Sequence, residues 1–179
     1  MQSCLNAARN VAHVLVETSE MCPCQPWITV DEQQVEGTAF PVRLPGRERL
    51  CFITNFHVVE DCRHKNSIQL ATAQRGMDRV SASVVFVIPK LDIAILETTS
   101  EELPVDALEL ETNRVECLAQ MCYTVGFPEG LTLQRQNGYI SGWSPDIEDH
   151  IVLNMSLNSG NSGGPIIDAS TGRVIAVAT

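Results

Sequence analysis

The sequence predicts an all-β fold, and three observations support this prediction. Short apolar runs recur along the chain, and turn-forming residues such as Pro45-Gly46 separate them. The composition is 44% hydrophobic but only 5% aromatic, so the core must consist mainly of Val, Ile, Leu and Ala, which favour strands in short runs. One run, residues 80–88, has the period-two spacing of a half-buried strand, with these residues on one face: Val80, Ala82, Val84, Phe86 and Ile88.

The first half of the chain contains six expected strands, preceded by a helical turn over residues 4–10. The strands cover residues 11–17, 38–44, 50–54, 67–72, 80–88 and 93–96. Residues 98–116 follow, rich in Glu, Asp and Leu and without a clear period. We therefore expect this segment to be a linker that crosses the surface.

The second half contains six further expected strands. They cover residues 121–125, 131–136, 138–142, 151–155, 165–168 and 174–178. So many short strands favour a barrel or a sandwich over alternating β-α units. A length of 179 residues fits one domain or two small, closely packed barrels.

The formal net charge of −10 argues against nucleic acid as a partner, because phosphate binding requires clustered Lys and Arg. We also expect no membrane partner, since no apolar stretch approaches the roughly 20 residues of a membrane span. The N-terminus lacks the basic and apolar layout of a secretory signal. The oligomeric state is left open.

The seven cysteines are an odd number, which argues against a full disulfide framework and for a reducing compartment. The expected location is therefore the cytoplasm. Cys22 and Cys24 could suggest half of a metal-binding knuckle, but no second pair has the usual spacing. We expect structural thiols, no metal site and no cofactor.

The strongest signal for chemistry is the segment Gly160-Asn161-Ser162-Gly163-Gly164-Pro165. A serine hydroxyl becomes an effective nucleophile when a tight turn holds it beside a base. Glycines allow the backbone to approach a substrate carbonyl closely. The N–H groups of Gly160 and Ser162 could then form an oxyanion hole. A glycine- and serine-rich loop without function is the alternative.

The base and the carboxylate that such a serine needs can be selected by context. Of the four histidines, His57 lies at a tight turn after the apolar run 52–56, whereas His13, His64 and His150 have ordinary surroundings. Asp92 opens an apolar strand, where a carboxylate needs a partner such as a protonatable histidine. The order His57, Asp92, Ser162 is that of the chymotrypsin-type triad.

Three motifs make the chain resemble the trypsin-like serine proteases, and their compact spacing is similar to that of the HtrA/Deg branch. The histidine motif covers residues 54–59, the aspartate motif residues 92–96 and the serine motif residues 160–165. Weaker matches lie at residues 37–40, 125–128 and 138–141.

The resemblance implies a chymotrypsin-like fold of two β-barrels with the triad between them. The first barrel is expected over residues 8–100 with His57 and Asp92, an acidic linker over 101–117, and the second barrel over 118–179 with Ser162. In the family a further strand follows the one that ends near residue 178. The second barrel is therefore expected to be truncated at its C-terminus, to have an open edge and to be prone to association.

The resemblance also bears on specificity and activation. It places the wall of the primary specificity pocket at Ser156 and Leu157, neither of which is charged. A small or medium apolar residue before the scissile bond is therefore favoured. Asn161 occupies the position of an aspartate that pairs with a new N-terminus in digestive proteases. A neutral amide cannot replace that charge, so activation by N-terminal cleavage is not expected.

The sequence therefore favours a serine endopeptidase that acts through an acyl-enzyme intermediate. The alternative is a non-catalytic module of the same fold that binds polypeptides or acts as a chaperone. A metal-binding or redox domain would rest on Cys22 and Cys24 alone.

Overall fold

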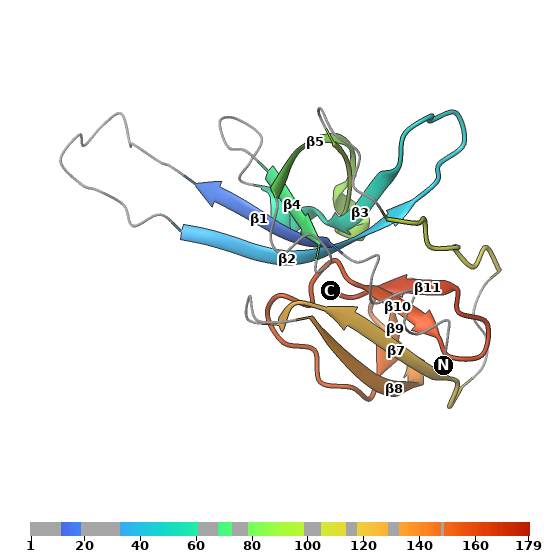
Figure 1. The fold of residues 1–179 in the computed structure, drawn as a ribbon. Coiled ribbons are helices and arrows are strands. Elements are labelled where there is room, and N and C mark those ends of the chain that lie inside the picture. Colours follow the sequence, from blue (N-terminus) through green and yellow to red (C-terminus); the bar gives the residue numbers. More distant parts are fainter. Residues whose placement is uncertain are drawn as a thin grey trace.

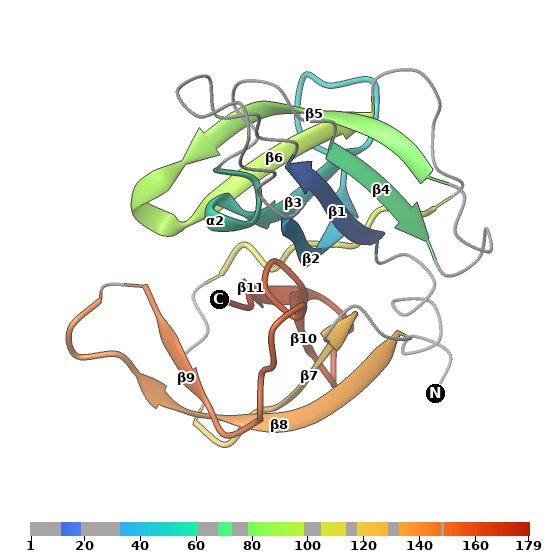
Figure 2. The same ribbon diagram turned by 90° about the vertical axis from the view of Figure 1, so that its left-hand side faces the viewer.

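The computed structural model describes residues 12–18, 33–60, 68–72, 79–98, 105–113, 118–128, 133–147 and 149–179. These residues form two curved antiparallel sheets, one above the other (Figures 1 and 2). No helix among them is long and apolar enough to span a membrane. The helical turn expected over residues 4–10 lies outside the described residues.

The first sheet is a closed six-stranded barrel with the order β1-β2-β3-β6-β5-β4. Two short helices, α2 (Phe56–Val59) and η3 (Pro89–Leu91), connect to β3 and β6. The strands are β1 (Ala12–Thr18), β2 (Gln33–Val42), β3 (Cys51–Asn55), β4 (Ile68–Thr72), β5 (Arg79–Ile88) and β6 (Ile93–Thr98).

The second sheet has five strands in the order β11-β10-β7-β8-β9. When the strands of each sheet are taken in chain order, β7 to β11 are arranged in the same way as β1 to β5 of the barrel. The place that β6 takes between β3 and β5 corresponds to a gap between β9 and β11, which are the two edges of the sheet. The strands are β7 (Met121–Gly126), β8 (Gln134–Trp143), β9 (Ile151–Leu153), β10 (Pro165–Asp168) and β11 (Val174–Val177). The predicted all-β two-barrel fold with an incomplete second barrel is confirmed.

Three groups of buried apolar side chains hold the molecule together. One fills the first barrel around Phe52, Leu70 and Leu96, and another lies inside the second sheet around Ile140 and Ile166. The third joins the sheets and contains Phe40, Val42, Cys51, Tyr123, Val125, Phe127, Ile167 and Val174. Because this last group draws on both sheets, burial of its apolar surface opposes their separation.

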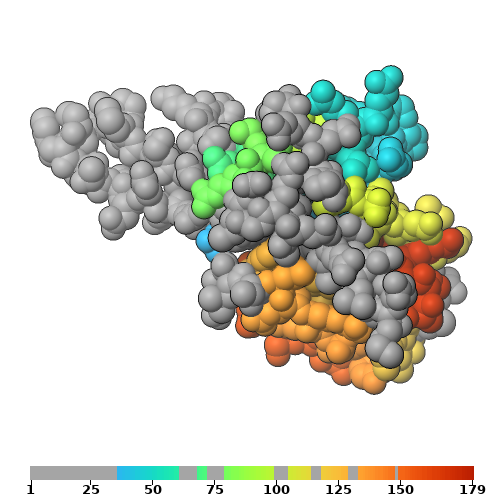
Figure 3. Space-filling model, in the orientation of Figure 1, coloured from blue at the N-terminus to red at the C-terminus, as the bar shows by residue number. Residues whose placement is uncertain are grey.

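The described part of the linker, residues 105–113, runs along the side of the molecule between the two sheets (Figures 1 and 3). It is attached to both of them. The Leu108 N–H donates to the Pro41 carbonyl of β2 at 2.8 Å, and the Val174 N–H of β11 donates to the Glu109 carbonyl at 2.8 Å. Leu110 also forms a parallel bridge with Val174.

Two strand predictions were wrong in detail. Residues 131–136 and 138–142 were expected to be separate strands, but Gly138 continues one strand, β8, and pairs with Cys122. A methyl group at Gly138 would lie 2.8 Å from Met155 Cβ, so this glycine permits a close approach of the chain and does not end the strand.

In β5, the expected inward face does not continue to Phe86, whose side chain is 56% exposed. The pairing with β6 shifts between Val84 and Phe86, so the strand carries a bulge there. The extra residue reverses the alternation, and Val87 packs against the barrel core in place of Phe86.

Candidate active site

The ends of two paired strands bring His57 and Asp92 together. Asn55, the last residue of β3, pairs with Ile93, the first residue of β6. His57 therefore follows β3 at the same end of the barrel where Asp92 precedes β6. The His57 Nδ1 lies 2.6 Å from Asp92 Oδ2, and the His57 backbone N–H donates to Asp92 Oδ1 at 2.9 Å.

Asp92 has a left-handed backbone with φ 52°, an uncommon conformation for a residue with a Cβ. Its carbonyl oxygen accepts hydrogen bonds from the Phe56 N–H and from the Asn55 side-chain amide, both at 3.0 Å. Together with the two contacts to His57, these bonds fix the backbone and the carboxylate of Asp92. Such over-determination is what allows a strained conformation to persist.

Thr179 provides a contact to Asp92 from the second sheet. Its hydroxyl donates to Asp92 Oδ2 at 2.9 Å. Partial burial raises the pKa of the Asp92 carboxyl, but the hydrogen bonds from His57 and Thr179 outweigh this, and the pKa lies below its ordinary value. Asp92 is thereby held as a carboxylate. Sequence reasoning missed Thr179, because nothing local marks a threonine whose partner is 87 residues away.

The predicted nucleophile, Ser162, lies in a tight loop before β10. Gly160 and Gly163 have φ values of 91° and 82°, which a residue with a side chain adopts only with strain. Within the loop, the Asn161 N–H donates to Asn158 and the Gly164 N–H donates to Asn161, at 3.0 and 2.9 Å. The Gly163 N–H donates to the Ala178 carbonyl at 2.9 Å.

The two amides that the sequence suggested as oxyanion donors differ from their neighbours in this loop. Asn161, Gly163 and Gly164 all donate their N–H groups within the protein. Among the residues that the structure describes, the N–H groups of Gly160 and Ser162 have no hydrogen-bond acceptor. Two N–H groups two residues apart are thus left for a ligand oxygen.

Gly37 brings Ser162 close to the helix that carries His57. A methyl group at Gly37 would lie 2.7 Å from Val58 Cγ1 and 3.2 Å from the Ser162 carbonyl oxygen. The neighbouring Thr38 N–H donates to that same carbonyl at 2.8 Å. Among the hydrogen bonds of the described residues, none joins the Ser162 hydroxyl to the His57 imidazole.

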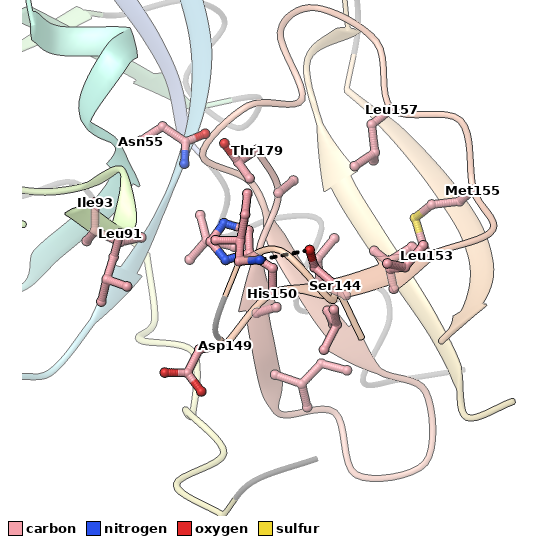
Figure 4. Close-up of a pocket in the computed structure, with 18 residues that line it drawn as sticks. Asn55, Leu91, Ile93, Ser144, Asp149, His150, Leu153, Met155, Leu157 and Thr179 are labelled. Atoms are coloured by element: carbon pink, nitrogen blue, oxygen red, sulfur yellow. Dashed lines mark hydrogen bonds between the residues drawn. The ribbon is translucent and has the colours of Figure 1, made fainter. Parts of the chain in front are cut away.

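A cavity of about 540 Å³ opens beside the His57–Asp92 pair, in the gap between β9 and β11. Figure 4 shows Leu91 and Ile93 of the first barrel on one side of it, with Met155 and Leu157 of the second sheet opposite. Asn55 and Thr179 line the cavity at its border with the pair. The lining is mainly apolar.

The predicted pocket residues differ in their positions. Leu157 is half-buried and lines the cavity, whereas Ser156 is exposed and is not among the lining residues. His150, which sequence context had set aside, lines the same cavity, and its carbonyl accepts the Ser144 N–H at 2.8 Å (Figure 4). Asn161, which precedes Ser162 in the serine loop, is 2% exposed.

The remaining candidates do not form a site among the described residues. Cys51 and Cys122 are free and buried in different apolar groups, and burial raises the pKa of both thiols. No group of three or more His, Cys, Asp or Glu able to hold a metal occurs in the part of the chain described. Cys22, Cys24 and His64 lie outside the described residues.

The chain matches known proteins in three ways. The family model of the trypsin-like peptidase domain matches residues 37–177. A probable periplasmic serine endoprotease, DegP-like, of Chlamydia trachomatis is 32% identical over 81% of this chain and 28% of its own length. Protease Do-like 5, chloroplastic, of Arabidopsis thaliana is 30% identical over 71% of this chain and 43% of its own length.

The fold comparison agrees with the sequence comparisons. The crystal structure of Deg5 superposes with a TM-score of 0.74 over 99% of this chain and 82% of that chain, at 22% identity. The chain spans less than half the length of the two curated relatives. The matched residues include His57, Asp92 and Ser162, which the fold places around one edge of the first barrel. The chain therefore belongs to the trypsin-like peptidase family, with proteases of the DegP/Deg type among its relatives.

Proposed function

We propose that this protein is a serine endopeptidase in which Ser162, His57 and Asp92 form the catalytic triad. The Ser162 oxygen attacks the peptide carbonyl while His57 takes the hydroxyl proton. The bond from carbon to the leaving nitrogen then breaks, and His57 returns the proton to that nitrogen. Water, activated by His57, hydrolyses the resulting ester and restores the serine.

The observation that carries this proposal is the charge-assisted pair between His57 Nδ1 and Asp92 Oδ2 at 2.6 Å. An imidazole whose Nδ1 faces a carboxylate presents its Nε2 as the base, and the carboxylate stabilises the imidazolium that forms. The hydrogen bond from Thr179 supports the ionised form of Asp92. The unpaired N–H groups of Gly160 and Ser162 supply donors for the oxyanion.

Polypeptides are the proposed substrates, in keeping with relatives named as serine endoproteases. We assign the residue before the scissile bond to the Leu157 side of the cavity. Met155, Leu157 and Ile175 line it with apolar groups, and Asp149, a carboxylate among the lining residues, lies away from Leu157 (Figure 4). An apolar side chain of small or medium size would be desolvated there without leaving a charge unpaired.

Hydrolysis of an unfolded, casein-type protein tests the proposal. The wild-type chain is expected to produce peptides whose new C-terminal residues are mainly Ala, Val or Leu. The S162A variant removes only the hydroxyl and is expected to produce none. Equal hydrolysis by both proteins would show that Ser162 is not the nucleophile.

A non-catalytic module that binds polypeptides is the second candidate. The observation in its favour is that no hydrogen bond joins the Ser162 hydroxyl to the His57 imidazole among the described residues. Binding of the casein-type protein that is equal in wild type and S162A, without hydrolysis by either, would support it.

A further inference from the structure

Thr38 connects the first barrel to the serine loop through its backbone and its side chain. Its N–H donates to the Ser162 carbonyl at 2.8 Å, and its hydroxyl donates to the Gly160 carbonyl at 2.6 Å. The same hydroxyl accepts the Phe127 N–H at 3.2 Å. On the barrel side, the Thr54 hydroxyl donates to the Thr38 carbonyl at 2.8 Å. Thr38 is 0% exposed, so these bonds do not compete with water.

The direction of the hydroxyl proton follows from its neighbours. The Phe127 N–H can only donate, and the Gly160 carbonyl can only accept. The single proton of the Thr38 hydroxyl must therefore point to Gly160. Removal of this hydroxyl would take away the acceptor of the buried Phe127 N–H and the donor to the buried Gly160 carbonyl.

These bonds fix two peptide groups on either side of the Asn161–Ser162 amide. The 160–161 peptide is held through its carbonyl by the Thr38 hydroxyl and through its N–H by the Asn158 carbonyl. The 162–163 peptide is held through its carbonyl by the Thr38 N–H and through its N–H by the Ala178 carbonyl. Both carbonyls thus face Thr38. The Ser162 N–H belongs to the peptide between these two, so its direction is set by them, and within the described structure neither it nor the Gly160 N–H has an acceptor.

We propose that Thr38 is a positioning residue that sets the conformation of the serine loop, and that its hydroxyl is the group responsible. The proposal rests on the function proposed above, since it concerns how that site is held. Thr38 acts from β2 of the first barrel, whereas the loop belongs to the second sheet. The first barrel therefore supplies the base and also fixes the conformation of the loop that carries the proposed oxyanion donors.

Two variants separate the hydroxyl from the bulk of the side chain. T38V keeps the volume and removes the hydroxyl, while T38S keeps the hydroxyl and removes a methyl group. T124V is the matched control, because Thr124 is 1% exposed and its hydroxyl has no hydrogen-bond partner. If T38V does not fold, T38C takes its place, because a thiol is only a weak donor and acceptor.

The first measurement is the second-order rate at which a fluorophosphonate labels Ser162, read by mass spectrometry. In this reaction His57 takes the hydroxyl proton, the serine oxygen bonds to phosphorus, fluoride leaves, and the phosphoryl oxygen occupies the oxyanion site. T38V is expected to label about 10²-fold more slowly, as for other small misplacements in an active site. The labelling rates of T38S and T124V are expected to stay within about threefold of the wild-type rate, a much smaller change than that expected for T38V.

The second measurement is amide hydrogen exchange over residues 158–164, which does not depend on activity. Exchange at Asn161 and Gly163 is expected to be faster in T38V and unchanged in T38S and T124V. Wild-type rates of labelling and exchange in T38V would overturn the proposal, as would equal losses in T38S and T38V. If wild type itself does not label, the proposed function fails, and the exchange data alone decide the role of Thr38.

Discussion

At the scale of single residues, hydrogen bonds hold both the backbone and the carboxylate of Asp92. Its carbonyl accepts two hydrogen bonds, and its carboxylate faces His57 and Thr179. A carboxylate that accepts several donors is stabilised in its charged form. Its orientation relative to His57 therefore depends on residues from both sheets.

The hydrogen bond from Thr179 is expected to matter for both stability and activity. T179V should lower the melting temperature at pH 6 by about 2–4 °C, which corresponds to about 1 kcal/mol for a chain of this size. It should also slow labelling of Ser162 about tenfold, because Asp92 then orients His57 less well.

The pH dependence of this effect follows from the lowered pKa of Asp92. A carboxyl with a lowered folded-state pKa contributes stability above its unfolded value, here 3.8, and loses it as the pH falls through the folded-state value. The difference in melting temperature between wild type and T179V should therefore shrink below pH 3.8. A difference that grows on acidification would contradict the assignment.

Thr171 offers a matched control at the opposite end of β10. Its hydroxyl donates to Asp168 Oδ2 at 2.9 Å. Partial burial raises the pKa of Asp168, but its hydrogen bonds from Ser170 and Thr171 outweigh this and lower it. T171V should thus destabilise the fold with the same pH dependence as T179V, while Ser162 labels at the wild-type rate.

Gly163 shows how little space surrounds the serine loop. A Cβ there would collide with the Thr54 hydroxyl and the Thr38 carbonyl, and φ is 82°. G163A is expected to abolish labelling and to destabilise the fold by more than the ~1–3 kcal/mol of backbone strain alone. Gly46 has a similar φ of 77° with nothing within 4 Å, so G46A measures the strain without the collision. Equal unfolding free energies of the two variants would show that the loop has room for a side chain.

At the scale of elements, the two edge strands β9 and β11 distinguish the second sheet from the closed first barrel. Unpaired edges favour pairing with other chains, and a charged side chain on an edge opposes it. We expect concentration-dependent association of wild type in light scattering and less of it in V152K. Val152 is 45% exposed on β9, and Y139K is the control, since Tyr139 is 43% exposed on the interior strand β8. Association that V152K and Y139K reduce equally would point to surface charge, not to the edge.

Strand patterns in the sequence predicted most elements but not their irregularities. Period-two counting located β5, yet it could not reveal the bulge that turns Phe86 outward, because the bulge depends on pairing with β6. Gly138 suggested a break, although in β8 it permits the approach of Met155. Turn signals are local, whereas the bulge in β5 and the continuity of β8 depend on neighbours that are distant in the sequence.

The same distinction applies to the candidate site. His57, Asp92 and Ser162 could be selected because each lies in a motif with its own local signature. Thr38 and Thr179 could not, because they act through partners 122 and 87 residues away. Nothing in the local sequence distinguishes a threonine with a positioning role from one with an ordinary structural role.

At the scale of the whole molecule, the site depends on the contact between the two sheets. The first barrel supplies His57, Asp92 and the bonds from Thr38, and the second sheet supplies Ser162 and Thr179. The apolar group around Phe40, Tyr123 and Val174 holds the two together. Displacement of the sheets would break both inter-sheet contacts, the one at Thr38 and the one at Thr179.

In the proposed mechanism Ser162, activated by His57 and Asp92, is the nucleophile. The most direct measurement is peptide mapping by mass spectrometry after treatment of the chain with a fluorophosphonate. We predict a single adduct on Ser162, no adduct in S162A, and labelling slowed by at least about 10³-fold in H57A, since the base then no longer accepts the hydroxyl proton. An adduct on another serine, or equal labelling of Ser162 in wild type and H57A, would contradict the claim.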